Sequence, residues 1–384
     1  WILPRRALRT RKAVMKFTQL ELRRIHLELV TPFRTSFGEQ TAREILLIGI
    51  TSDDGTVGLG ECVAMSEPLY SPEYVSGVET VITEFLAPRL AQRSDVIAGD
   101  VADILRPIKG HQMAKAAIEM AVLDAELRSG GSNLHTRFGG TRHTIPSGVS
   151  VGIFSSIDAL LSAVQGYVDD GYARIKLKIE PGWDLEPVRL VRELIGPEMG
   201  LQVDANTAYT RQDFDHLRQL DMYDLLLIEQ PLDTDDLLGH RDLAAAIETP
   251  VCLDESIESL TQAEDAVAIG AAEIINIKPG RVGGYLEAVR IHDLCRAHDI
   301  PVWCGGMLET GIGRAANCAL AALDGFVLPG DISASRRFYA RDIVCEPIEV
   351  VAGEVAVPTA PGLGYDLDAE FVESVTTSLQ HVSL

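Results

Sequence analysis

The fold is decided by the segments ARIKLKI (173–179), GLQVDA (200–205), LLLIEQ (225–230), PVCLDE (250–255) and IINIKP (274–279). Each segment is a short apolar run that carries a charged residue near its end, and an amphipathic helical pattern follows it. Two similar runs, GVSVGI (148–153) and PVWCGG (301–306), flank this series. Strands that alternate with helices predict βα units and a parallel sheet. At least seven such units favour a closed barrel over an open sheet.

Charged residues follow these strands at a nearly constant interval. Lys178 and Asp204 are 26 residues apart, Asp204 and Glu229 are 25, Glu229 and Asp254 are 25, and Asp254 and Lys278 are 24. One βα unit has about this length, so the five residues occupy equivalent positions on five successive strands. The C-terminal ends of the strands converge where parallel barrels carry their active sites. The interval therefore predicts one shared site rather than five separate, solvated loop charges.

The three carboxylates Asp204, Glu229 and Asp254 would repel one another at such a site unless a cation joined them. Hard oxygen ligands suit Mg²⁺, with Mn²⁺ or another divalent ion as the alternative, and not Zn²⁺, which prefers nitrogen or sulfur. No HxH, HExxH or cysteine cluster in the sequence competes for the metal. We therefore expect a Mg²⁺ site with coordination positions left for a substrate carboxylate.

Lysines flank these carboxylates. Lys176 and Lys178 alternate with Leu177 in one strand, so both should face the barrel interior, about 6.6 Å apart. Lys176 either forms structural salt bridges or, together with the metal, raises the positive potential and so favours the neutral amine that Lys178 needs as a base. Lys278 should approach from the other side of the site.

This arrangement predicts an enzyme that removes the proton next to a carboxylate. Such a proton is very weakly acidic, because its removal places a second negative charge on the carboxylate, as an enediolate. A divalent cation held at those oxygens would stabilise this charge as it develops. A second ammonium group could stabilise the intermediate or return a proton to the opposite face.

The composition excludes several other classes of function. The net charge of −22 repels phosphate backbones and anionic lipids, so we expect neither a nucleic-acid nor a membrane partner. A small-molecule carboxylate substrate stays compatible with this charge, because a buried site sets its own local field. The six cysteines include no CxxC pair and most lie in apolar runs, which predicts reduced thiols and a cytoplasmic protein. No apolar run is long enough for a transmembrane helix.

The remaining patterns divide the chain into four parts. Residues 1–14 are expected to be a disordered or non-native extension, because Met15 opens a strand-like pattern. Residues 15–140 contain three strand patterns followed by helical patterns, which predicts an α+β capping domain. Residues 141–340 carry the barrel. Residues 341–384 form short strands and turns that should pack back on the capping domain.

Longer motifs around these positions resemble a known family. KLK (176–178), VDAN (203–206), IEQP (228–231), LDES (253–256) and NIKPGRVGG (276–284) resemble the muconate-lactonizing subgroup of the enolase superfamily, and VWCGGMLETGIGRAAN (302–317) and PGD (329–331) extend the match. PFRTSFG (32–38), GECVAM (60–65) and PLYSPEY (68–74) resemble its two specificity loops. Together they closely resemble the o-succinylbenzoate synthase / N-succinylamino acid racemase family. The resemblance implies a (β/α)7β modified TIM barrel under an α+β capping domain, in a homo-oligomer from dimer to octamer.

The resemblance also implies roles for individual residues. Asp204, Glu229 and Asp254 would bind Mg²⁺, and Lys178 and Lys278 would be the acid/base pair, a lysine and Mg²⁺ combination typical of the superfamily. Auxiliary positions would be Lys176, Asn206, Glu255 and Ser256. Substrate-binding positions would be Ser150, Gly306, Met307, Glu309, Phe338 and, on the capping domain, Phe33, Phe37, Met65 and Tyr70. For each capping-domain residue, ordinary packing between domains is an equal alternative.

The implied function is o-succinylbenzoate synthase, which dehydrates 2-succinyl-6-hydroxy-2,4-cyclohexadiene-1-carboxylate in menaquinone biosynthesis, with N-succinyl or N-acylamino acid racemase activity at the same site. The alternatives are a dedicated racemase, a muconate cycloisomerase, a dipeptide epimerase and a metal-binding barrel without turnover. Mandelate-racemase-like enzymes carry a histidine where Lys278 stands. His292 and His298 do not supply it and are expected to be surface residues, which argues against that mechanism.

Overall fold

The computed structural model describes residues 15–384, and the extension expected at residues 1–14 lies outside them. The predicted parallel sheet is present, with its strands hydrogen-bonded to one another in chain order. Its strands are β5 (Gly148–Val151), β6 (Arg174–Lys178), β7 (Gly200–Asp204), β8 (Ile228–Glu229), β9 (Val251–Leu253), β10 (Ile274–Ile277) and β11 (Val302–Cys304). In-register parallel pairs place Lys178 beside Asp204 and Asp204 beside Glu229, as the spacing predicted.

An extended segment at residues 326–331 closes this sheet into a barrel. On one side Phe326 bridges Val302, and the amide of Asp331 donates to the carbonyl of Cys304 at 2.9 Å. On the other side Gly330 bridges Ser147, just before β5. This segment therefore takes the eighth strand position, and the (β/α)7β barrel is confirmed.

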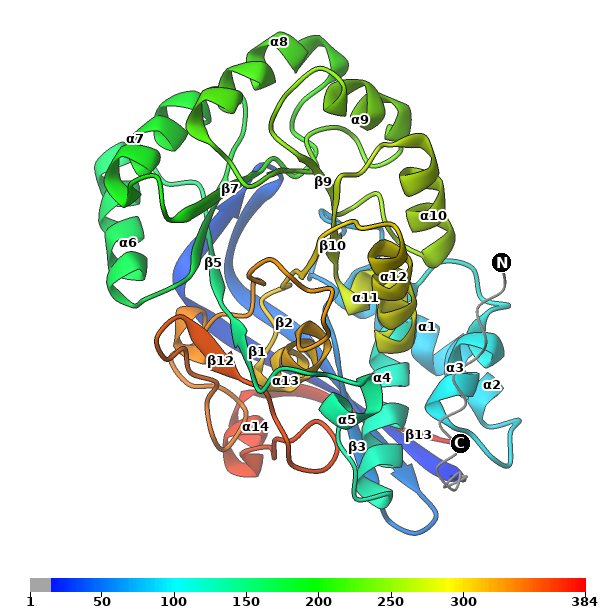
Figure 1. Ribbon diagram of the computed structural model, residues 1–384. Helices are drawn as coiled ribbons and strands as arrows, with labels where there is room; N and C mark the ends of the chain where they lie inside the picture. The colour runs from blue at the N-terminus through cyan, green and yellow to red at the C-terminus, as the bar shows by residue number, and fades with distance from the viewer. Residues whose placement is uncertain (1–14) are drawn as a thin grey trace.

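Helices cover the outside of the barrel (Figure 1). They are α6 (Ile157–Asp169), α7 (Leu185–Ile195), α8 (Phe214–Leu217) with the 3₁₀ helix η3 (Arg218–Tyr223), α9 (Leu237–Ala244), α10 (Leu260–Ile269), α12 (Tyr285–Ala297) and α13 (Gly311–Ala321). In α6, the Ser156 hydroxyl caps the N-terminus by accepting from the amide of Ala159, and Leu160 and Val164 lie buried four residues apart on one face. Within residues 15–384, we find no helix with the length and apolarity required to cross a bilayer.

The capping domain is an antiparallel sheet backed by helices. Its sheet has the order β13 (Thr376–Ser383), β1 (Phe17–Thr35), β2 (Gly38–Ser52) and β3 (Val57–Cys62). Its helices are α1 (Val75–Val81), η1 (Ile82–Leu86), α2 (Ala87–Leu90), α3 (Ala98–Leu105), α4 (Gln112–Ser129) and α5 (Leu134–Phe138). A Cβ on Gly58 would lie 2.0 Å from the carbonyl oxygen of Ala121, so only glycine lets β3 pack this closely on α4.

The C-terminal segment contacts both parts of the molecule. It contains β12 (Glu354–Ala356), α14 (Ala369–Val375) and β13. Strand β12 pairs with β4 (Thr144–Pro146), whereas β13 pairs with β1 in the capping sheet. The domain boundaries near residues 140 and 340 stay predictions.

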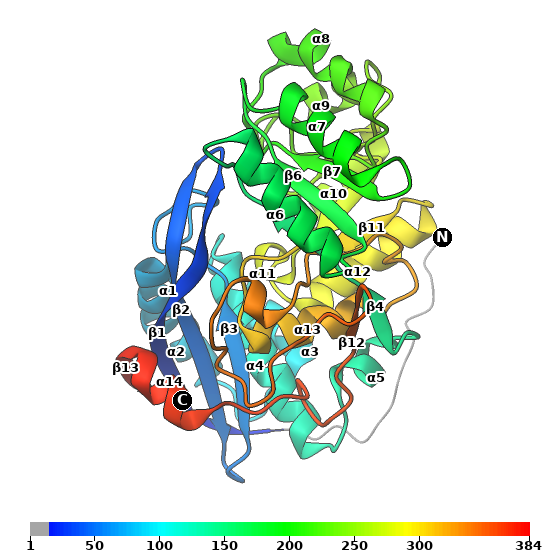
Figure 2. The same cartoon turned by 90° about the vertical axis from the view of Figure 1, so that its left-hand side faces the viewer.

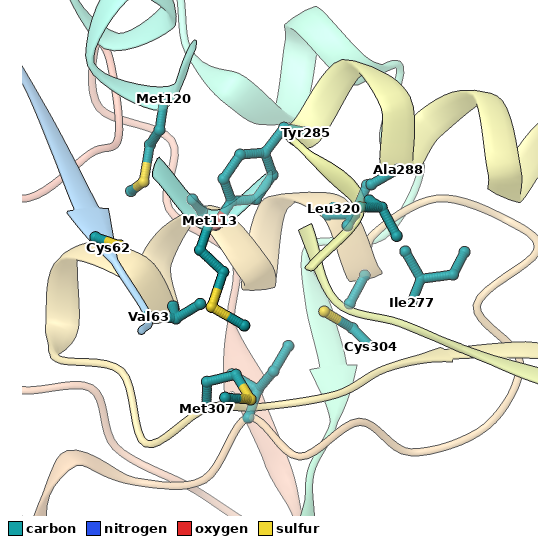
Figure 3. Close-up of a cluster of buried hydrophobic side chains, with 14 of the residues drawn as sticks. Cys62, Val63, Met113, Met120, Ile277, Tyr285, Ala288, Cys304, Met307 and Leu320 are labelled. Atoms are coloured by element: carbon teal, nitrogen blue, oxygen red, sulfur yellow. The ribbon is translucent and has the colours of Figure 1, made fainter. Parts of the chain in front are cut away.

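Two buried carboxylates of the capping domain accept hydrogen bonds from barrel helices. Glu119 in α4 accepts from the amides of Tyr285 and Leu286 at the start of α12, and burial raises its pKa to about 8. Glu61 in β3 accepts from the amides of Thr310 and Gly313 at the start of α13. Apolar side chains from both domains belong to one buried cluster, and Figure 3 shows Met113 and Tyr285 close together in it. The two parts therefore share one core.

The long β1–β2 hairpin extends toward the mouth of the barrel (Figure 2). Its tip contacts loops that follow the barrel strands. The carbonyl of Arg34 accepts from the amide of Ile153 after β5, and the Ser36 hydroxyl lies 3.1 Å from the carbonyl oxygens of Ala205 and Asn206 after β7. The hairpin thus covers the face at which the charged residues converge.

Candidate active site

The structure brings together the five residues that the spacing placed at one site. Lys178, Asp204 and Glu229 are the last residues of β6, β7 and β8, and Asp254 and Lys278 directly follow β9 and β10. All five side chains are buried. Each therefore reaches the same end of the barrel from a neighbouring strand.

Lys176 lies at the centre of a buried ion-pair network. Its Nζ is 3.2 Å from Asp204 Oδ2, 3.0 Å from Glu229 Oε2 and 2.5 Å from Asp331 Oδ2. The other oxygen of Asp331 accepts from Arg174 at 2.8 Å. Asp331 was not among the predicted site residues, although it belongs to the PGD motif (329–331). The only signal for it was that motif, because the pairing depends on closure of the barrel.

Lys178 donates to two oxygens of the next strand. Its Nζ is 2.6 Å from Asp204 Oδ2 and 2.6 Å from Asn206 Oδ1. The side-chain nitrogen Nδ2 of Asn206 in turn donates to Glu255 Oε1 at 2.9 Å. Asn206 and Glu255, both predicted auxiliary residues, therefore orient the Lys178 ammonium group.

Lys278 lies across the barrel from Lys178. Strands β6 and β10 are four positions apart in a barrel of eight positions, so the two lysines approach from opposite sides. Lys278 Nζ is 2.7 Å from Asp254 Oδ2 and 3.2 Å from the hydroxyl of Tyr70. Arg281, which was not among the predicted site residues, also pairs with Asp254.

The Asp254 loop is held by hydrogen bonds between neighbouring strand ends. The side-chain oxygen of Gln230 accepts from the backbone amides of Asp254 and Ser256, at 3.0 and 3.2 Å. The Ser256 hydroxyl donates to the carbonyl of Thr234 at 2.7 Å. Ser256 thus supports the loop that carries Asp254, and its auxiliary role stays a prediction.

The charges at this site perturb one another strongly. Burial and the neighbouring charge of Asp204 raise the pKa of Glu229 to about 8. Burial opposes ionisation of Asp204, but the ammonium groups of Lys178 and Lys176 outweigh it and lower the pKa of that carboxyl. Burial also opposes the charge on Lys278, yet the Asp254 carboxylate raises the pKa of this lysine. Ion pairs therefore compensate the charges in this buried region.

The three central carboxylates have the donor chemistry for a hard divalent cation. Asp204, Glu229 and Asp254 are fully buried oxygen donors on three adjacent strands. The raised pKa of Glu229 reflects burial and repulsion from the other two, which an added cation would relieve. Throughout residues 15–384, no three acidic, histidine or cysteine side chains already surround one point as metal ligands, because lysine and arginine meet these carboxylates instead.

A pocket with about 630 Å³ of empty volume lies above this network. Lys176, Lys178 and Lys278 form its charged floor together with the neutral side chain of Asn206, whereas the three central carboxylates are fully buried and do not line the pocket. Eight of the nine predicted substrate-binding residues line the pocket: Phe33, Phe37, Met65, Tyr70, Ser150, Gly306, Met307 and Phe338.

Glu309 was expected on the pocket wall but lies behind it. Its carboxylate accepts from the amide of Met307 at 2.8 Å and from the side chain of Asn317 at 3.0 Å. It therefore shapes the loop that carries Met307. The pocket also includes residues that carried no distinctive signal in the sequence, among them Thr35, Gln40, Arg43, Leu308 and Ser333.

Lys278 takes the strand-end position at which mandelate-racemase-like enzymes carry a histidine. The expectation that His292 lies on the surface was wrong. His292 is buried rather than on the surface: its ring stacks on Phe326, and its Nε2 accepts from the amide of Gly325. The stacking requires the closing segment of the barrel, which the local sequence of the helix does not reveal. His298 is exposed at the end of α12, as expected.

Comparison with known proteins agrees with this geometry. Residues 159–371 match the enolase C-terminal domain-like family, and residues 19–139 match the mandelate racemase / muconate lactonizing enzyme N-terminal domain. An N-succinylamino acid racemase from Amycolatopsis sp is 57% identical over 95% of this chain and 98% of its own length. An o-succinylbenzoate synthase from Geobacillus kaustophilus is 46% identical over 92% of this chain and 94% of its own.

A solved structure gives the same result for the whole architecture. An enolase superfamily member from Listeria innocua Clip11262 is 42% identical, with a TM-score of 0.92 over 96% of this chain and 99% of its own. Both domains thus match one family. This chain belongs to the o-succinylbenzoate synthase / N-succinylamino acid racemase family, in the muconate-lactonizing subgroup of the enolase superfamily.

Proposed function

We propose that this chain is an o-succinylbenzoate synthase that also racemises N-succinyl and other N-acylamino acids. The observation that carries the proposal is the lysine pair, Lys178 and Lys278, on opposite sides of one pocket. Two ammonium groups facing each other can reach both faces of a carbon atom held between them. Relatives named for the synthase and for the racemase both match nearly the full chain, which supports proposing both activities.

We propose Asp204, Glu229 and Asp254 as the residues that hold Mg²⁺. The bound ion would supply positive charge that stabilises the substrate carboxylate while its negative charge increases. Lys176 and Asp331 form the adjoining ion pair and would keep Glu229 and Asp204 in place. Replacing one of the three carboxylates should therefore abolish metal binding while the protein stays folded.

In the proposed dehydration, Lys178 removes the proton next to the ring carboxylate. The adjacent hydroxyl then leaves as water after receiving that proton from Lys178, so that the ring becomes aromatic. Asn206 accepts from Lys178 at 2.6 Å and would keep its Nζ directed at the carbon. Lys278, as an ammonium group on the other face, would stabilise the enediolate.

In the proposed racemisation, both lysines transfer protons. One lysine removes the α-proton of an N-acylamino acid and the other returns a proton to the opposite face, so each enantiomer has its own base. The two reactions share the first step and differ in whether Lys278 donates a proton. Tyr70, 3.2 Å from Lys278 Nζ, would orient this ammonium group.

The test is α-proton exchange of N-succinylphenylalanine in D₂O, followed by NMR with and without Mg²⁺. We expect Mg²⁺-dependent exchange that is lost in Asp204→Ala, with the circular dichroism spectrum retained. An intact, metal-loaded protein without exchange on any α-carboxylate substrate would contradict the proposal, and full activity of Asp204→Ala would contradict the ligand assignment. The ratio of the two kcat/KM values, synthase to racemase, would then establish which activity dominates.

We also propose a cytoplasmic homo-oligomer, as the family resemblance implies. All six cysteines lie within residues 15–384 and none is in a disulfide, which suits a reducing compartment. Sedimentation of the purified chain would measure its oligomeric state directly.

A further inference from the structure

Arg43 is a buried cation of the capping domain that lines the pocket. It lies in β2, and its side chain is only 3% exposed. One terminal nitrogen donates to the side-chain oxygen of Gln40 at 3.1 Å, and the other donates to the carbonyls of Val63 at 3.1 Å and Ala64 at 3.5 Å. Its Nε is buried and has no hydrogen-bond partner. The guanidinium group is thus oriented but only partly satisfied.

Arg43 also differs from the other pocket cations in its charge environment. Lys176, Lys178 and Lys278 each have a carboxylate oxygen within 3.2 Å. Within the described part of the chain, no Asp or Glu oxygen lies within ion-pair distance of Arg43. Carbonyl and amide oxygens satisfy individual N–H groups, but they do not neutralise a positive charge. Because buried charges in proteins are normally paired, the missing anion here should arrive with a ligand.

The position of Arg43 separates this anion from the reacting carboxylate. The three lysines form the barrel side of the pocket, at the strand ends, and would face the carboxylate next to the proton that leaves. Arg43, Gln40, Thr35 and Met65 come from the capping domain and form another part of the wall. A ligand that fills the pocket therefore meets cations from both domains, the lysines of the barrel and Arg43 of the capping domain.

We propose that Arg43 is a specificity-determining residue that binds a second carboxylate of the substrate. This inference rests on the proposed function, since it assumes that the first carboxylate reacts at the lysines. The second carboxylate could come from the end of an N-acyl group or from an amino acid side chain. In either case an oxygen of this carboxylate would accept from an N–H of the guanidinium group that has no partner in the structure.

A purely structural role makes a different prediction. Arg43 bonds the backbone at residues 63–64, just before Met65, so its loss could simply displace that wall of the pocket. Such a displacement would reduce turnover of every substrate to a similar extent. Recognition of a carboxylate would reduce turnover only of substrates that carry the second charge.

The experiment compares three substrates in wild type and in Arg43→Met. N-succinylphenylalanine carries the second carboxylate on its acyl group, N-acetylglutamate carries it on the side chain, and N-acetylphenylalanine has none. We expect kcat/KM to fall roughly 10- to 100-fold for at least one of the two dicarboxylates, and less than about 3-fold for N-acetylphenylalanine. The substrate that shows the selective loss identifies the source of the second carboxylate.

Arg34→Met is a matched control, because it removes the same charge from the same hairpin. Arg34 is half-exposed, pairs with Glu180 at 2.9 Å and does not line the pocket, so the substrate preference should stay unchanged. Equal losses on all three substrates in Arg43→Met, or no loss on any, would overturn the inference. Absence of turnover of all three by wild type would instead contradict the proposed function, and with it this inference.

A second measurement needs no variant and covers the case in which Arg43→Met does not fold. Wild type is assayed with the neutral counterparts of the two dicarboxylates, the methyl ester of the succinyl group and N-acetylglutamine. We expect neutralising the recognised carboxylate to lower kcat/KM by a similar factor, roughly 10-fold or more. Unchanged kcat/KM for both neutral counterparts would overturn the inference.

Discussion

Asp331→Asn should destabilise the barrel strongly while leaving its shape almost unchanged. The carboxylate is 2.5 Å from Lys176 Nζ and 2.8 Å from Arg174 Nη1, and both cations are buried. At an effective dielectric constant of about 20, each contact has a gross attraction of about 6 kcal/mol. Dehydration of the ions offsets most of this, and loss of one partner of a buried pair typically costs about 3–5 kcal/mol.

The corresponding thermal shift follows from the size of the protein. With about 2.1 cal/mol/K per residue, unfolding of 384 residues has an entropy of about 0.8 kcal/mol/K. A loss of about 4 kcal/mol should therefore lower the Tm by about 5 °C in differential scanning calorimetry. Asp366→Asn, which affects the exposed pair with Arg128, is the control and should shift the Tm by less than about 1 °C. An equally small shift for Asp331→Asn would refute this account of the network.

Three further predictions concern the interface and the base. Burial raises the pKa of Glu119 from 4.5 to about 8, so the Glu119 carboxyl group binds its proton more tightly in the folded state than in the unfolded chain. The free energy of unfolding should therefore fall as pH rises from about 4.5 to about 8, by at most about 5 kcal/mol. Glu119→Gln should flatten the plot of Tm against pH. Parallel plots for wild type and the variant would contradict this prediction. Gly284→Ala should lower the Tm markedly, because φ is 141° and the new Cβ would lie 1.9 Å from Glu119; an unchanged Tm would show that the helix can shift. Asn206→Ala should reduce racemase kcat roughly 10-fold or more with little change in KM, since Lys178 loses one of its two acceptors at 2.6 Å; an unchanged kcat would remove Asn206 from the proposed mechanism.

The sequence revealed the site because the charged residues repeat with the length of a βα unit. That interval fixes both the strand and the position on it, so Lys178, Asp204, Glu229, Asp254 and Lys278 could be placed together before any contact was known. Alternation with Leu177 in one strand predicted that Lys176 and Lys178 share a face, and the structure directs both to Asp204.

Other features depend on contacts between distant segments, which local patterns do not encode. Asp331 meets Lys176 only because residues 326–331 close the barrel, and that segment has no strand pattern of its own. In the sequence, Arg43 is one charged residue of a half-buried strand. Among residues 15–384, the structure shows no anionic partner for it, and this could not be predicted from the local pattern. The orientation of Glu309 also depends on contacts within the fold. Its motif placed it near the pocket, but its carboxylate accepts hydrogen bonds from Met307 and Asn317 and does not line the pocket.

The central claim, that Lys178 and Lys278 act on opposite faces of one carbon, is tested most directly with separate enantiomers. Deuterium exchange of D- and L-N-succinylphenylalanine in D₂O is measured for Lys178→Ala and Lys278→Ala with Mg²⁺ present. The account predicts that each variant loses exchange of the one enantiomer whose proton faces the missing lysine, and that neither variant racemises. Loss of the same enantiomer in both variants, or racemisation by either of them, would contradict it.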